Sequence, residues 1–318
     1  MFNRSSRLLE AFAAHKLILT EGAMVERLRR NPLIKLDPFV ANASLLFSQA
    51  GRQALSSLWR EYIVIAQKHS MEILLYTPTW RVNGERLALA GLPDVGQVAI
   101  EAFVLLDSIR SEYSEFGNEI YIGGLVGCKG DAYAPQDALD VDEAEDFHRP
   151  HVNAFAKSGI DLLLATTLPA LSEATGLAKA MSDTDVAYGI SFVLRPNGTL
   201  LDGTPIADAI AAIDGSVDKP PVAYFANCVH PDNLYLALSA AVESHPEILN
   251  RFLGLQGNTS RKSPEELDES VLLDTDDPEA FAFAMHAVRE KFSLSVLGGC
   301  CGTDNKHIAA IAEQCMRN

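Results

Sequence analysis

The chain has 318 residues, of which 48% are hydrophobic and 21% charged, which is the balance of a folded globular protein and not of a disordered one. Its 26 lysines and arginines stand against 42 aspartates and glutamates, so the formal net charge is −16. A chain this acidic repels phosphate backbones, and we expect no nucleic-acid partner.

Eight short apolar segments follow one another along the chain, and in each the apolar residues are nearly continuous. That pattern is typical of strands buried on both faces of a parallel sheet. Amphipathic stretches between them, such as 54–68, 98–113 and 280–290, have helical spacing. The apolar segments are 17–19, 73–76, 120–126, 160–164, 186–193, 222–225, 252–255 and 294–297.

Eight predicted strands separated by helices indicate an α/β protein with a (β/α)8 (TIM) barrel, which we expect to form one domain over residues 1–318. A doubly wound open sheet is the structural alternative. It would normally place a Gly-x-Gly-x-x-Gly turn after its first strand, and residues 21–26 lack one. Three long polar segments, 128–142, 195–205 and 256–277, follow predicted strands, so we expect them at the carboxyl end of the barrel, where active sites of such barrels lie.

Neither export nor membrane insertion is predicted. No segment reaches the roughly 18 consecutive apolar residues of a membrane span. Glu10 and His15 interrupt the amino-terminal segment, which therefore fits a secretory signal poorly. The five cysteines, an odd number in a long chain, do not form a disulfide framework, and we expect a reduced, cytoplasmic protein.

Three of the cysteines come directly after predicted strands. Cys228 follows the sixth apolar segment, and Cys300 and Cys301 follow the eighth. Alternate strands of a barrel contribute side chains to the same interior layer, so residues 72 positions apart can meet at one opening. Three thiolates with a fourth position left open are the arrangement of a catalytic zinc site.

The neighbouring residues support this interpretation. Gly298 and Gly299 allow a sharp turn, so that two adjacent side chains reach one ion. Thr303 or Asp304 is expected to begin the last helix, 307–316, whose positive end favours ionised sulfur. Asn227 and His230 flank Cys228 and are candidates to orient the ligands.

A cysteine taken alone is more often a small core residue than a ligand. The adjacent pair within Gly-Gly-Cys-Cys-Gly departs from that rule, because a core needs no such run of small residues. Cys315 lies at helical spacing with Ile308, Ile311 and Ala312, so we expect it in the core. We expect Cys128 to be a loop thiol.

The cysteine motifs resemble those of a known family. Residues 298–303, Gly-Gly-Cys-Cys-Gly-Thr, together with Asn227-Cys228 about 70 positions earlier, are similar to the motifs of the homocysteine S-methyltransferases. Segments 21–24, 77–80, 159–162 and 202–205 also resemble that family, so the likeness covers nearly the whole chain.

The resemblance implies a zinc-dependent methyltransferase on a (β/α)8 barrel, with Cys228, Cys300 and Cys301 as the metal ligands. It implies methyl transfer from a small sulfonium or ammonium donor to a thiol, homocysteine or an analogue, as in methionine biosynthesis. It also implies substrate-binding roles for the residues Glu21, Gly22, Thr77 and Thr166. Its partners are then small molecules, and a homodimer is an open possibility.

Four positions depart from the family pattern. Glu21 is one methylene longer than the usual aspartate, and Thr166 carries no charge where the family has a glutamate. Pro78 replaces an asparagine, and Cys128 replaces the proline of a Gly-Pro step after the third strand. These changes fall on the pocket for the substrate's amino group and not on the three ligand cysteines. Two alternatives therefore remain open: a zinc barrel acting on a different small thiol, and a non-catalytic binding homologue.

Overall fold

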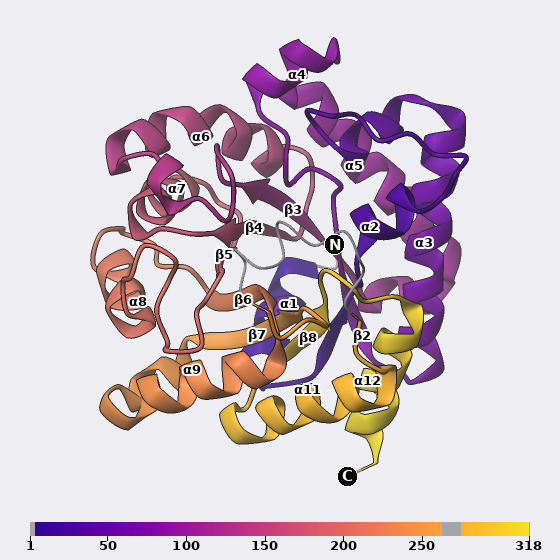
Figure 1. Cartoon of the computed structure of the whole chain (residues 1–318). Coiled ribbons are helices and arrows are strands. Elements are labelled where there is room, and N and C mark those ends of the chain that lie inside the picture. Colours follow the sequence, from indigo (N-terminus) through magenta and orange to yellow (C-terminus); the bar gives the residue numbers. More distant parts are fainter. Residues whose placement is uncertain (1–3, 263–274, 318) are drawn as a thin grey trace.

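The strands of the chain close into a parallel barrel. The computed structural model describes residues 4–262 and 275–317, and in it eight strands lie in chain order, with the first also paired to the eighth (Figure 1). This confirms the predicted (β/α)8 barrel. The strands are β1 (Ile18–Thr20), β2 (Glu72–Tyr76), β3 (Ile120–Gly127), β4 (Leu162–Leu168), β5 (Tyr188–Phe192), β6 (Ala223–Val229), β7 (Phe252–Gly257) and β8 (Val296–Gly299).

Helices surround the barrel on its outer side. The three predicted amphipathic stretches form α3 (Gln49–Lys68), α5 (Val95–Arg110) and α11 (Pro278–Phe292), each a few residues longer at its start than the pattern indicated. The remaining helices among the described residues are α1 (Arg4–Ala13), α2 (Met24–Arg29), α4 (Gly84–Ala90), α6 (Val141–Ala156), α7 (Leu171–Ser182), α8 (Ile206–Asp214), α9 (Pro231–Ser244) and α12 (Asn305–Met316). Short 3-10 turns occupy Asn42–Phe47, Ser111–Glu119, Pro135–Asp137 and Pro246–Asn250.

Polar side chains begin several of these helices, as capping requires. Asp94 Oδ1 accepts a hydrogen bond from Gln97 N at 3.0 Å and so starts α5. Asp304 caps α12 in the same way through the backbone amides of Lys306 and His307. The second of the two predicted caps for this helix, Asp304, is therefore the correct one.

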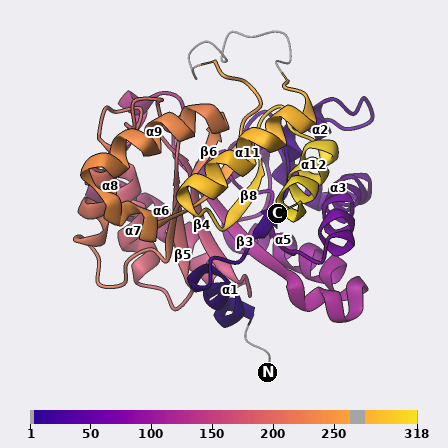
Figure 2. The same ribbon diagram turned by 90° about the horizontal axis from the view of Figure 1, so that it is seen from below.

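The helix α1 closes the amino end of the barrel and was not predicted. Its Leu8 and Phe12 are buried with the inward side chains Leu74, Leu164 and Phe225 in one apolar cluster. Figure 2 shows α1 at one end of the strands, and its Phe12 ring contacts Phe225 edge-on with centroids 6.3 Å apart. Burying a side chain of this size contributes about 2 kcal/mol to stability. Through these contacts, α1 covers the end of the barrel opposite the site described below.

Several strands end beyond their predicted apolar segments, and β4 and β6 extend furthest. β4 includes Thr166 and Thr167, and β6 includes Cys228, because both continue past an irregularity in strand pairing. The predicted polar segment 128–142 contains a 3-10 turn and the start of α6. Part of the third polar segment, 263–274, lies outside the described residues, as do residues 1–3 of the amino-terminal segment.

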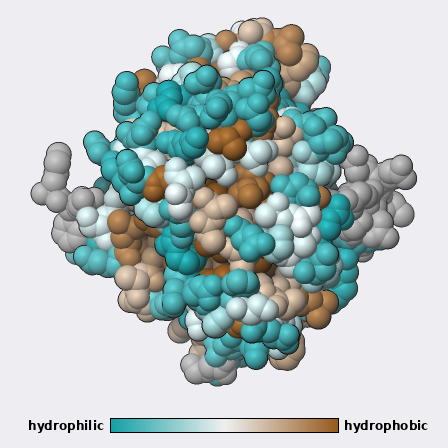
Figure 3. All heavy atoms as spheres, turned by 90° about the vertical axis from the view of Figure 1, so that its left-hand side faces the viewer, coloured by the Kyte–Doolittle hydropathy of each residue, from teal (hydrophilic) through white to brown (hydrophobic). Residues whose placement is uncertain are grey.

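The described surface is mixed. On the face drawn in Figure 3, hydrophobic residues are scattered among hydrophilic ones, as is usual for a globular protein. No single helix among the described residues is long and apolar enough to cross a membrane. One bent pair of helices, Gly84–Ala90 with Val95–Glu119, is long and apolar enough only when the two are taken together. Within this pair, α5 buries residues such as Leu106 and Ile109 against the barrel.

Candidate metal centre at the carboxyl end of the barrel

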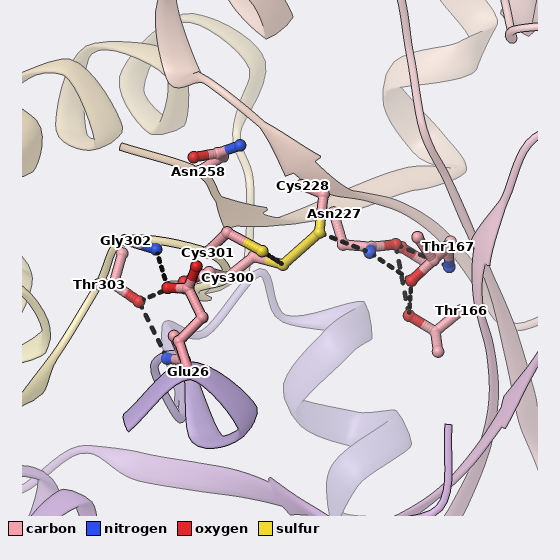
Figure 4. Close-up of a disulfide and its surroundings, with 12 residues drawn as sticks. Glu26, Thr166, Thr167, Asn227, Cys228, Asn258, Cys300, Cys301, Gly302 and Thr303 are labelled. Atoms are coloured by element: carbon pink, nitrogen blue, oxygen red, sulfur yellow. Dashed lines mark hydrogen bonds between the residues drawn. A yellow bond between two sulfur atoms is a disulfide. The ribbon is translucent and has the colours of Figure 1, made fainter. Parts of the chain in front are cut away.

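Three cysteine sulfurs meet at the carboxyl end of the barrel. The Sγ atoms of Cys228, Cys300 and Cys301 all lie within 4.8 Å of one another, and each side chain is half-buried. Figure 4 shows them together, with Asn227 and Thr167 on one side and Glu26 and Thr303 on the other. The predicted convergence of residues on β6 and just after β8 is confirmed.

The structure joins Cys228 and Cys300 in a disulfide, with their Cα atoms 5.4 Å apart. The expectation that both are reduced is wrong for this state of the protein. The physical reason is the convergence itself, since sulfurs brought together to share one ion also lie within bonding reach of each other. Cys301 is a free thiol, with its Sγ 3.9 Å from that of Cys300.

A left-handed backbone turns Cys228 toward the other two sulfurs. Cys228 has φ = 56°, and Thr167 on β4 has φ = 59°. Each of these conformations costs a non-glycine residue about 1–3 kcal/mol, and neighbouring structure must hold it. Both residues lie at pairing irregularities of their strands, where the regular ladder no longer fixes the chain.

Asn227 holds the two strained residues. Its Oδ1 accepts hydrogen bonds from Thr167 N at 2.9 Å and Ser191 Oγ at 2.6 Å. Its Nδ2 donates to Thr167 Oγ1 at 2.7 Å and to Cys228 Sγ at 3.6 Å. The side chain is 3% exposed, so this network is buried. The predicted role of Asn227 beside Cys228 therefore agrees with its contacts.

The double glycine before the cysteines is needed for space. Gly298 and Gly299 do not have positive φ, so the predicted sharp turn is not made there; it falls on Gly302, with φ = 81°. A Cβ atom on Gly298 would collide with the Thr20 hydroxyl, and one on Gly299 would collide with that of Thr303. The glycines let β8 pack closely against β1 and the following loop.

Thr303 ties the cysteine loop to the start of α2. Its Oγ1 donates to Cys300 O at 2.7 Å and accepts from Ala23 N at 3.1 Å. A Cβ on Gly22 would lie 3.0 Å from the same oxygen and 2.8 Å from the Tyr62 hydroxyl. Gly22, predicted to bind substrate, thus keeps this junction open.

Glu21 is buried and directed toward α3. Its Oε2 accepts from Trp59 Nε1 at 3.2 Å and from Tyr76 N at 3.0 Å. Burial raises the pKa of Glu21 to about 8, so the carboxyl is mostly protonated at neutral pH in the free protein. The predicted substrate carboxylate is present near the site but largely uncharged.

The two predicted threonines have protein partners. Thr166 Oγ1 donates to Asn227 Oδ1 at 3.3 Å, which places it in the network beside Cys228. Thr77 Oγ1 accepts from Leu125 N at 3.0 Å and lies 2.7 Å from Thr79 Oγ1, linking β2 to β3. Both side chains are at least nine-tenths buried.

Other residues singled out from the sequence lie elsewhere. His230 caps α9, accepts from Asp232 N at 3.1 Å and contacts Asp276 at 3.0 Å, so its ring is bonded to these two residues and not to Cys228. Cys128 lies in the loop that follows β3, as expected, and it is buried there against the main hydrophobic core. Cys315 is half-buried and packs against that core, in line with its predicted place.

Sequence reasoning missed Ser191, Thr167 and Glu26. The first two are hydroxyl residues inside apolar strands, and that contrast was a usable signal. Glu26 lies in an ordinary helical stretch, and only the fold brings it to the cysteine loop, where Gly302 N donates to its Oε2 at 2.6 Å.

The donor set fits a soft, tetrahedral metal. Thiolates select Zn²⁺ and similar ions, and three of them leave one position for a substrate. In the metal-free protein the pKa of Cys301 is raised to about 12 by burial and by the negative charge of Glu26. Binding of a cation would reverse this, because a metal deprotonates its thiol ligands.

A half-buried triad of cysteines at the carboxyl end of a (β/α)8 barrel defines a candidate metal-binding barrel protein. The sequence model of the homocysteine S-methyltransferase family matches residues 18–315. The chain therefore belongs to that family, as its motifs indicated.

Individual relatives agree. The homocysteine S-methyltransferase of Escherichia coli (strain K12) is 36% identical over 126 residues, 37% of this chain and 40% of the relative. YbgG of Bacillus subtilis (strain 168), also a homocysteine S-methyltransferase, is 26% identical over 206 residues, 59% of this chain and 58% of the relative. These two alignments span about half of each relative's length. Betaine–homocysteine S-methyltransferase 1 of Bos taurus is 20% identical over 98% of this chain and 75% of its own.

Solved structures share the fold. The oxidized form of the homocysteine methyltransferase MmuM from Escherichia coli has a TM-score of 0.75 at 23% identity, with 94% of this chain and 96% of that one covered. Its metallated form gives a TM-score of 0.74 at 22% identity over the same shares.

Proposed function

We propose that the protein is a zinc-dependent S-methyltransferase. It moves a methyl group from a small sulfonium or ammonium donor to a thiol, with homocysteine or a close analogue as the acceptor. The observation that carries the proposal is the meeting of Cys228, Cys300 and Cys301 within 4.8 Å at the carboxyl end of the barrel. Membership of the homocysteine S-methyltransferase family supports it.

In this proposal the three cysteines hold the zinc ion once the Cys228–Cys300 disulfide is reduced. A bound zinc ion would lower the pKa of an acceptor thiol at its open position and so supply a thiolate nucleophile at neutral pH. Asn227 Nδ2 donates toward Cys228 Sγ and orients that ligand. A cationic donor leaves as a neutral molecule after methyl transfer, so no acid is required to protonate it.

Glu21, Gly22, Thr77 and Thr166 are the proposed contacts of the acceptor. Gly22 provides space beside Thr303, and Thr166 adjoins the network of Asn227. An ammonium group near Glu21 would favour its ionised form, although burial opposes it. Because Thr166 is uncharged, the pocket offers fewer charges to an amino acid than the family pattern does, which favours an analogue of homocysteine as a second candidate acceptor.

Further parts of the account are proposals of the same kind. We assign residues 1–318 to one barrel domain that works in the cytoplasm, with small-molecule thiols and methyl donors as partners. A role in methionine biosynthesis follows if homocysteine is the acceptor. A homodimer is compatible with this account.

The proposal is tested with the reduced, zinc-loaded protein. S-methylmethionine, dimethylsulfonioacetate and betaine are offered as donors with homocysteine as the acceptor, and methylated products are followed by mass spectrometry. We expect donor- and zinc-dependent formation of methionine or of another S-methyl thioether. Zinc binding without turnover of any thiol and donor would instead favour the non-catalytic homologue.

A further inference from the structure

Apart from a bond to Glu26, the loop that carries Cys300 and Cys301 is held by shorter hydrogen bonds at its ends than in its middle. At its start, Cys300 N donates to Gly257 O on β7 at 2.7 Å. At its end, Thr303 Oγ1 donates to Cys300 O and accepts from Ala23 N. The middle of the loop, Cys301 and Gly302, is held by two longer backbone bonds, from Thr303 N to Cys300 O and from Thr259 N to Cys301 O, each 3.2 Å.

Glu26 supplies the remaining tie. Its Oε2 accepts a hydrogen bond from Gly302 N at 2.6 Å, which is at the short end of the range for such bonds. Gly302 has φ = 81°, a conformation that few other residues adopt, and it directs the amide toward α2. The Glu26 side chain is 23% exposed, and its ion pair with Arg30 is long, at 3.7 Å. Exposed pairs of that kind contribute little, so the contact with Gly302 is the main bond of this carboxylate.

The hydrogen bond between Glu26 and Gly302 matters because Cys300 and Cys301 are adjacent in sequence and both supply a sulfur. Consecutive side chains of an extended chain point to opposite sides, yet Cys300 and Cys301 place their sulfurs 3.9 Å apart. The backbone between residues 300 and 302 must therefore hold an irregular course, and Glu26 is bonded to the residue next to Cys301 (Figure 4).

We propose that Glu26 is a positioning residue whose carboxylate holds the Cys300–Gly302 segment against α2 and so keeps Cys301 Sγ in place as the third ligand. The inference rests on the metal site proposed above. It concerns the hydrogen bond to Gly302 N and not the charge of Glu26.

Three variants separate the bond from the charge. Glu26→Gln keeps an oxygen that can accept from Gly302 N but removes the charge, Glu26→Ala removes both, and Glu26→Asp keeps the charge on a side chain one methylene too short. Glu61→Ala is the matched control. Glu61 lies on α3 and forms an ion pair at 2.7 Å with Arg27, the residue next to Glu26 on α2.

The first measurement needs no metal and no substrate. Amide hydrogen exchange at Gly302 is followed in the reduced, metal-free protein. We expect exchange about tenfold or more faster in Glu26→Ala and Glu26→Asp, and unchanged in Glu26→Gln and Glu61→Ala. Exchange in Glu26→Ala that equals the wild-type rate overturns the proposal.

The second measurement is affinity for zinc, by competition with a chromophoric chelator, and the absorption spectrum of the cobalt-substituted protein. Loss of a group that orients a ligand typically weakens metal binding by about 10–100-fold, which we expect for Glu26→Ala and Glu26→Asp, with an altered cobalt spectrum. We expect Glu26→Gln to stay within about threefold of the wild type. Equal losses in Glu26→Gln and Glu26→Ala would assign the effect to charge and overturn the inference. A wild type that binds no zinc would contradict the proposed metal site, while the exchange result would still decide the contact.

Discussion

Asn227 Nδ2 donates to Thr167 Oγ1 at 2.7 Å, and this bond joins β6 to β4 beside the two residues with a left-handed backbone, Thr167 and Cys228. The same amide nitrogen lies 3.6 Å from Cys228 Sγ. A single buried side chain thus couples the shape of the strand ends to the position of one sulfur.

Replacing Asn227 by alanine should therefore affect stability and the metal site together. Leaving buried partners such as Thr167 N and Ser191 Oγ without an acceptor is expected to cost about 2–4 kcal/mol of unfolding free energy in total. Urea unfolding measures this, and chelator competition should show weaker zinc binding as well. Asn197→Ala, at an exposed turn, is the control and should change stability by less than about 0.5 kcal/mol.

Gly298→Ala tests whether close packing is the reason for the double glycine. The added Cβ would collide with Thr20 on the neighbouring strand, and overpacking of this kind typically costs about 1–3 kcal/mol or more. Thermal unfolding is the measurement. Gly84→Ala offers a clean comparison, because a Cβ there meets nothing within 4 Å. Equal melting temperatures for the two variants would show that the close contact is unimportant.

The buried carboxyl of Glu21 predicts a distinctive pH dependence. Its folded-state pKa, about 8, is raised above that of the unfolded chain, so the folded state retains a proton that the unfolded state releases. Wild-type stability should therefore fall as pH rises from about 4.5 to 8, relative to Glu21→Gln, and the difference should level off above pH 8. A shift of this size corresponds to a few kcal/mol, roughly 2–5. Urea unfolding of both proteins between pH 5 and pH 9 measures it, and a constant difference across that range would contradict the assignment.

Acceptor choice depends on the same region. Thr166 provides no charge for an ammonium group, and a buried charged hydrogen bond is worth about 1.5–3 kcal/mol, or one to two decades in discrimination. We therefore expect 4-mercaptobutyrate to compete with homocysteine within about tenfold in kcat/KM. Thr166→Glu should shift the preference toward homocysteine.

A second variant tests the contribution of Glu21 to this choice. If its carboxyl ionises beside a bound ammonium group, Glu21→Gln should selectively impair the use of homocysteine. A wild-type preference for homocysteine of several decades, unaffected by Glu21→Gln, would show that neither residue sets specificity.

Much of the architecture could be predicted because it depends on local patterns. Continuous apolar segments marked all eight strands, and their number indicated the barrel that the pairing of β1 with β8 closes. The convergence of Cys228 with Cys300 followed from the rule that alternate strands share an interior layer. The end of a strand was harder, since threonines and cysteine broke the apolar pattern of β4 and β6 before the ladder ended.

The directions of individual side chains could not be predicted. Glu21 occupies the expected place after β1, yet its carboxyl is bonded to Trp59 and Tyr76 N, and only the packing of α3 reveals this. The amino-terminal helix was missed because its role is to cover the open end of the barrel, a tertiary contact without a local signature. Glu26 was also missed, because its contact with Gly302 is a tertiary contact that no local pattern indicates.

The content of zinc per chain tests the central claim most directly. The protein is reduced, loaded with zinc, freed of excess metal without chelator and analysed by atomic emission, alongside Cys228→Ala, Cys301→Ala and the control Cys315→Ala. We predict about one zinc ion per chain in the wild type and in Cys315→Ala, strong loss in the other two variants, and loss from the wild type when the Cys228–Cys300 disulfide is re-formed. Equal zinc in wild type and Cys301→Ala would contradict the assignment of these three cysteines as the metal site.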